Sequence, residues 1–85
     1  MNIAWLIQMV NKYGSSLTEA WPYILHAWQD MQKAMVIFND GKPLMLEGPL
    51  SDDAASLQAM LVEKGIDPNE ARQVVAAAEA ADGRV

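Results

Sequence analysis

Cysteine is absent from this chain of 85 residues, and histidine occurs only once, as His26. The lack of cysteine excludes a disulfide framework and any thiolate metal site, and one histidine cannot form a histidine pair for zinc. A chain of this length buries only about 60 to 65% of the surface that its unfolded form exposes, and small domains of this kind are often stabilised by disulfides or metal ions. This chain must be stabilised in another way. The sequence therefore predicts no metal and no cofactor, and favours further burial against another copy, a partner protein or a membrane surface.

Basic residues are also scarce. Six Lys and Arg stand against eleven Asp and Glu, which gives a formal net charge of −5 and a pI near 4.5. This charge repels phosphate backbones, and the basic residues form no cluster, so we expect no nucleic-acid binding. The five glycines are isolated from one another, and none belongs to a glycine-rich phosphate loop.

Long hydrophobic runs are missing as well. The longest uncharged stretch, Met1 to Asn11, is well short of the roughly 20 apolar residues that a membrane-spanning helix needs. No basic residue precedes it and no small-residue cleavage site follows it, so it does not fit a secretory signal. We therefore expect no signal peptide and no transmembrane helix, and a location in the cytoplasm or within a larger assembly.

The residues that are present divide the chain into two unlike halves. All six aromatic residues lie in the first 38 positions, and residues 1–42 carry three basic and three acidic groups. Residues 43–85 hold three basic and eight acidic groups and nine of the thirteen alanines. We predict one small helical domain over residues 1–85, with a neutral aromatic contact half (1–42) and an acidic, alanine-rich helical hairpin (51–83).

The fold class predicted from these patterns is all-α, with four short helices. The first is expected over Asn2 to Tyr13, with Gly14 as its C-terminal cap. Its polar residues form one narrow stripe, and apolar residues cover nearly every other side. Because twelve residues are too few for independent helicity in water, this helix must be buried by something outside itself.

The second helix is expected to begin at a capping box formed by Ser16 and Glu19 and, because of Pro22, to kink or restart near Trp21. Its apolar face recurs at helical spacing. That face comprises Trp21, Ile24, Leu25, Trp28, Met31, Met35 and Phe38, and the reverse face Tyr23, His26, Asp30, Lys33 and Ile37. In an alternative interpretation, residues 35–38 and 44–46 pair as a short β-hairpin across the Asp40-Gly41 turn.

The third helix is expected to start at Ser51 or Asp52 and to close at Lys64 and Gly65. Asp67-Pro68-Asn69-Glu70 is a strong start signal for the fourth, which should end near Ala81. The hairpin is expected to bury Leu57, Leu61, Ile66, Ala71, Val74, Val75 and Ala78, with Ala54 and Met60 also on the inner face of the third helix. The segment from Leu61 to Val75 is similar to the first-turn region of ubiquitin-associated domains, but Lys64 and Ile66 replace the Met and aromatic residue of those domains, and no function is carried over.

Signals for chemistry are weak. His26 and Asp30 lie one helical turn apart and could orient an imidazole, but no nucleophile for such a base can be identified. Asp52 and Asp53 could contribute to a cation site, but adjacent residues point in different directions on a helix. An acidic first turn of a helix is the favoured interpretation of this pair. We therefore predict a protein that is not an enzyme.

The aromatic half carries the functional prediction, because Trp is enriched at interaction hot spots. We expect a non-catalytic interaction or structural subunit that binds a protein partner or forms a homo-oligomer, for example as a component of a virus particle. The alternative is a peripheral membrane protein whose first helix lies in the lipid interface. The predicted contact residues are Ile3, Trp5, Leu6, Ile7, Val10, Trp21 and Trp28.

Overall fold

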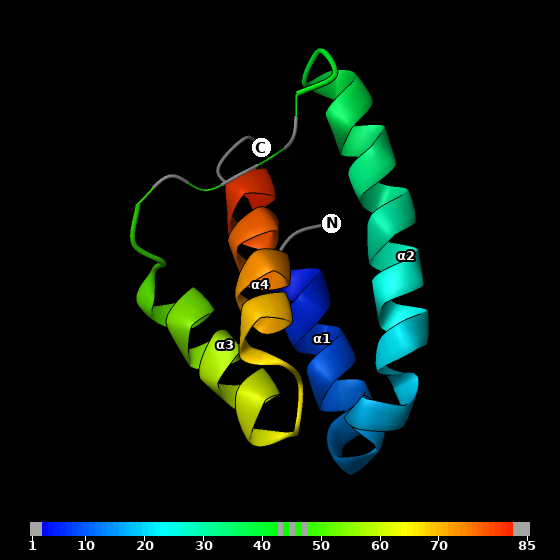
Figure 1. The fold of residues 1–85 in the computed structure, drawn as a ribbon, viewed down its shortest axis with the longest axis vertical. Helices are drawn as coiled ribbons and strands as arrows, with labels where there is room; N and C mark the ends of the chain where they lie inside the picture. The colour runs from blue at the N-terminus through cyan, green and yellow to red at the C-terminus, as the bar shows by residue number, and fades with distance from the viewer. Residues whose placement is uncertain (1–2, 43, 45, 47, 83–85) are drawn as a thin grey trace.

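The computed structural model describes residues 3–42, 44, 46 and 48–82, and of Phe38 only the backbone (Figure 1). Its elements are α1 (Ile3–Tyr13), the 3-10 turn η1 (Gly14–Ser16), α2 (Leu17–Phe38), α3 (Asp52–Glu63) and α4 (Pro68–Asp82). No strand occurs among the described residues, which confirms the all-α class. Residues 35–38 belong to α2, so the alternative β-hairpin is wrong. Asn2, Met45 and Gly83, which entered the expectations above, lie outside the described residues.

The helices form two antiparallel pairs, α1 with α2 and α3 with α4, and the two pairs pack against each other through α1 and α4. In Figure 1, α1 descends to η1 and α2 returns beside it, while α3 descends and α4 returns. α4 packs against α3 and against α1, and α1 also contacts α2 and α3. The C-terminal half of α2 extends beyond the end of α1 in Figure 1. One end of α2 is therefore held by α1 and η1, and its other end projects from the bundle.

The turn between α1 and α2 follows from Gly14, which has a φ of +51°. This left-handed conformation suits glycine and confirms its predicted place at the end of α1. The capping box is wrong, since Ser16 makes no side-chain capping hydrogen bond. α2 continues through Pro22 as one helix of 22 residues, without the predicted restart. Pro22 removes the hydrogen bond to the carbonyl of Thr18 only, and Thr18 is exposed, so water can replace that bond.

The α3–α4 hairpin is fixed at both ends by hydrogen bonds. Ser51 caps α3, because its hydroxyl accepts from the Ala54 amide at 3.3 Å, and its own amide donates to both carboxylate oxygens of Glu79 at 3.0 and 3.1 Å. At the other end, the Asp67 carboxylate accepts from the Glu70 amide at 3.1 Å, as the start signal predicts.

The predicted inner face of this hairpin is largely confirmed. Its buried members are Ala54, Leu57, Leu61, Ile66, Ala71, Val74, Val75 and Ala78. Met60 was expected among them, but its side chain is 38% exposed. The buried face of α3 is thus narrower than the sequence suggests, because small alanines on α4 bring the two helices together along one line.

Candidate interaction surface

The predicted contact residues lie mostly inside the chain's own core. Leu6 and Val10 are 0% and 1% exposed, and Trp21 and Trp28 are 6% and 5% exposed. The remaining three, Ile3, Trp5 and Ile7, are partly buried and pack against that core. The prediction that α1 needs external burial overlooked how many sides one chain can cover: α2, α3 and α4 all contact α1. Of the predicted residues, only the partly buried three retain surface for a partner.

The tryptophans join α2 to the rest of the bundle. The rings of Trp5 and Trp28 stack with centroids 5.8 Å apart and an angle of 26° between their planes. Trp21 donates its indole N–H to the carboxylate of Glu70 at the start of α4. Below them, the Thr18 hydroxyl donates to the Lys64 carbonyl at 2.8 Å. These contacts hold the first half of α2, and Met31, one turn beyond Trp28, also packs against the core.

A groove separates α2 from α4 and runs along α2 from Leu25 to Val36. It has a volume of about 440 Å³. Its walls are apolar side chains with a few amides and one carboxylate. They comprise Leu25, Trp28, Gln29, Gln32, Val36, Leu44, Glu70, Gln73, Val74 and Ala77. The sequence did not reveal this groove, because the helical period marks which face of α2 is apolar but not how closely α4 approaches it.

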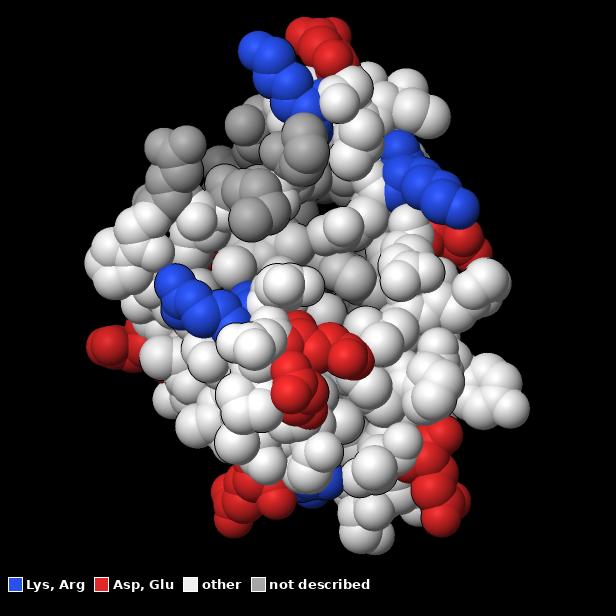
Figure 2. All heavy atoms as spheres, in the orientation of Figure 1, with Lys and Arg blue, Asp and Glu red and all other residues white. Residues whose placement is uncertain are grey.

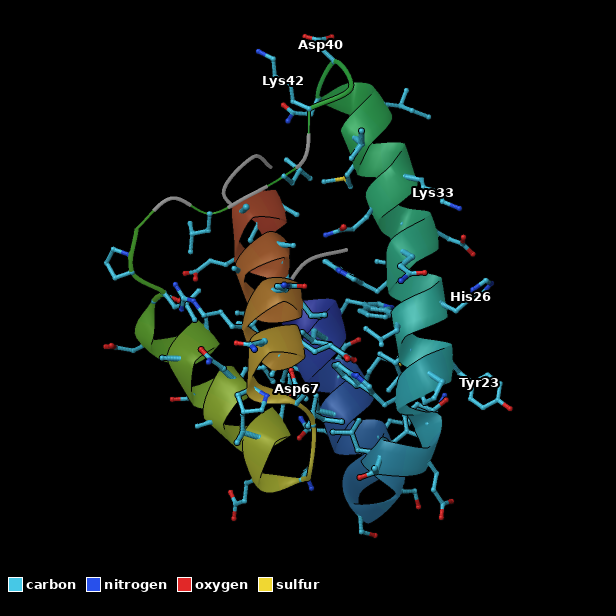
Figure 3. The ribbon with its side chains drawn as sticks, viewed as in Figure 1. Tyr23, His26, Lys33, Asp40, Lys42 and Asp67 are labelled. Atoms are coloured by element: carbon cyan, nitrogen blue, oxygen red, sulfur yellow. The ribbon has the colours of Figure 1, made fainter. Side chains whose placement is uncertain are left out.

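The outer face of α2 is the second uncovered surface. Figure 3 shows Tyr23, His26 and Lys33 on the side of α2 that points away from the other helices. Tyr23 is 79% exposed and Ile37 is 76% exposed, whereas Met60 and Val62, the other large hydrophobic residues at the surface, are each 38% exposed. The predicted reverse face of α2 is thereby confirmed, and it carries the two most exposed large hydrophobic side chains among the described residues.

The His26–Asp30 pair also lies on this outer face. His26 Nε2 is 3.8 Å from Asp30 Oδ2, and the two side chains are 79% and 61% exposed. Water therefore surrounds both groups, which offers no enclosed site for a substrate. The pair has the geometry of an ordinary surface contact one helical turn apart.

A metal site is not apparent in the part of the chain that the structure describes. Asp52 and Asp53 occupy the first turn of α3, where the helix dipole favours carboxylates, and both are exposed. Across the described residues, no three His, Asp or Glu side chains gather closely enough to hold an ion. These carboxylates are placed to support α3.

Charge on the surface is dispersed. In Figure 2, acidic and basic side chains alternate around the visible face, and none of the acidic groups there merge into one broad patch. The edge formed by α2 carries basic and acidic side chains, among them Lys33, with uncharged surface between them. Neither sign of charge dominates this edge, so it has no strong long-range attraction for a partner of one charge.

No helix within the described ranges combines the length and apolar character that crossing a bilayer requires. Comparison with models of known protein families, with curated proteins and with solved structures found no match for this chain. The similarity of residues 61–75 to ubiquitin-associated domains thus has no support from a family model, and Ile66, at the position of their exposed aromatic residue, is 5% exposed.

Proposed function

We propose that this chain is a non-catalytic interaction or structural subunit that self-associates, either alone in the cytoplasm or within a larger assembly. The observation that carries the proposal is α2 itself, which borders a largely apolar groove on one side and exposes Tyr23 and Ile37 on the other. Apolar grooves and contiguous apolar surface of this kind often mark binding sites, and the groove beside α2 is walled mainly by apolar side chains. α2 is therefore the contacting element of the proposal.

The buried core supports the same assignment. Leu6 and Val10 are buried inside the bundle, so α1 offers few side chains to a partner or to lipid. Beyond Trp28, by contrast, α2 carries Val36 and Ile37 at its surface, beside a groove that α4 does not fill. A protein surface that covers both would supply the burial that so small a chain lacks.

Light scattering after gel filtration, at several protein concentrations and without detergent, tests the proposal. The expected result is a defined oligomer whose mass is a whole multiple of 9.3 kDa. The double variant Val36→Asp, Ile37→Asp is expected to shift the mass to that of the monomer, because two carboxylates would be buried without partners in any contact made by this surface.

The matched control places the same two charges on the exposed stripe of α1, as Gln8→Asp with Asn11→Asp. This control should keep the wild-type mass, and circular dichroism should show equal helicity for both variants. A wild-type chain that is monomeric at every concentration contradicts self-association. An oligomer that both double variants leave intact would instead show that α2 is not the contact.

A further inference from the structure

The hydrophobic residues on the outer face of α2 follow a pattern. Tyr23 and Ile37 are 14 residues, or two heptads, apart, which is about 21 Å along a helix. Asp30 lies midway between them, seven residues from each. A heptad period keeps the three side chains on one stripe, with a drift of only about 20° per heptad on a straight helix. The small residues Ala27 and Ala34 border this stripe, and they let another helix approach closely.

We infer that this stripe pairs with the same stripe of a second copy, with the two α2 helices antiparallel and a two-fold axis at Asp30. The inference rests on the proposed self-association and names the surface and the geometry that produce it. An antiparallel arrangement centred on Asp30 brings Tyr23 of each copy to Ile37 of the other. Both exposed hydrophobic side chains are then covered by one symmetric contact, in which each surface is its own complement.

The charged side chains favour this arrangement over a parallel one. In the antiparallel pair, Lys33 of each copy lies within one helical turn of Asp30 of the other, so two ammonium groups surround two carboxylates. His26, which is 3.8 Å from Asp30 in its own chain, flanks the same cluster. A parallel pair in register also brings Lys33 within one turn of the other copy's Asp30, but it places Lys33 directly against Lys33, whereas the antiparallel pair separates the two lysines by about 9 Å along the axis. The charges therefore favour the antiparallel direction for a second copy.

The surface beside Ile37 is also suited to an aromatic ring. It is a shallow face of α2 itself, formed by Gln29, Gln32, Lys33, Val36 and Ile37. In the antiparallel pair, the tyrosine ring of the second copy reaches α2 at this end of the stripe and can lie against Val36 and Ile37. Because one helix pair buries less than a standard interface of about 1,600 Å², the dimer should dissociate on dilution.

Engineered cysteines test the geometry without removing Tyr23 or Ile37, and the chain has no other thiol. In the antiparallel pair, residue 27 of one copy lies almost opposite residue 34 of the other, within the reach of a disulfide. The two copies of residue 27 are about 9 Å apart along the helix axis, and the two copies of residue 34 are about 12 Å apart. The variants Ala27→Cys and Ala34→Cys, one of them labelled with ¹⁵N, are mixed and oxidised, and linked peptides are identified by mass spectrometry.

The expected product is the mixed 27–34 disulfide, in clear excess over the 27–27 and 34–34 products. The control pairs Ala27→Cys with Ala59→Cys, an exposed alanine of α3, and should give no preferred mixed product. An excess of the 27–27 and 34–34 disulfides would show a parallel pair and overturn the inference. An oligomer by light scattering without any preferred disulfide would overturn it too, while leaving the proposed self-association intact. A monomeric wild-type chain would contradict both the antiparallel pairing and the proposed self-association.

A charge exchange provides a second readout. Asp30→Lys and Lys33→Glu each place four like charges at the two-fold axis and should raise the dimer dissociation constant by at least about tenfold in sedimentation equilibrium. The double variant, which exchanges the two charges, should restore dimerisation. If the double variant is as weak as the singles, the charges do not meet across a two-fold axis and the antiparallel pairing is wrong.

Discussion

Replacing Leu6 with alanine is expected to lower the free energy of unfolding by about 3 kcal/mol, within the range for large-to-small changes in a core. Leu6 is 0% exposed and sits on α1, which contacts the other three α-helices, so the missing atoms leave a cavity that the bundle cannot readily close. The same residue would have a different effect if α1 were a peripheral contact helix. In that case the substitution would weaken association and leave the fold intact. Urea unfolding followed by circular dichroism, at one fixed protein concentration, measures the change.

Gln8→Ala is the matched control, because Gln8 lies two residues away on the exposed side of α1. Its effect on the free energy of unfolding should stay within about 0.5 kcal/mol. If Leu6→Ala were as mild as this control while the oligomer dissociated, α1 would act as the contact helix of the sequence-based prediction, and its central place in the bundle would be contradicted.

Replacing Ala78 with leucine is expected to cost about 2 kcal/mol by overfilling the core. Ala78 is 0% exposed on α4, the helix that packs against both α3 and α1. Three additional carbon atoms there must push neighbouring helices apart or force strained rotamers. Thermal unfolding should show a midpoint lower by roughly 10 °C, given the small size of the domain.

The control for this change is Ala59→Leu, the same substitution at an exposed position of α3. Leucine and alanine are both good helix formers, so this variant should unfold close to the wild-type temperature. A stabilised Ala78→Leu variant would indicate unfilled space beside α4 and would contradict the tight packing of the alanine-rich helix.

Much of the local structure follows from short-range signals. Ser51, Asp67 and Pro68 mark helix starts, because a side-chain oxygen there satisfies an amide that the first turn leaves free, and proline lacks one of those amides. Gly14 marks the end of α1, because its positive φ is costly for other residues. At Ser16 and Pro22 the same rules failed. η1 supplies the start of α2 there, and tertiary contacts of Trp21 and Trp28 hold the helix together.

The candidate surface was predictable only in part. The helical period identified the outer face of α2, with Tyr23 and Ile37 on it, because periodicity alone decides which side chains share a face. It could not show that Tyr23 and Ile37 are more exposed than the apolar residues of α1. Their relative exposure depends on which helices cover α1, and sequence spacing within one helix carries no information about its neighbours.

By itself, the sequence determined the all-α class, the helix boundaries at its caps and glycines, and the two faces of α2, since each depends on residues within a few positions of one another. Only the tertiary structure decided that α1 lies at the centre and that α2 projects from the bundle beside an open groove. The physical reason is the alanine content of α4. Small side chains let α3 and α1 approach α4 closely, and α1 is thereby buried by its own chain, while the end of α2 remains beyond their reach.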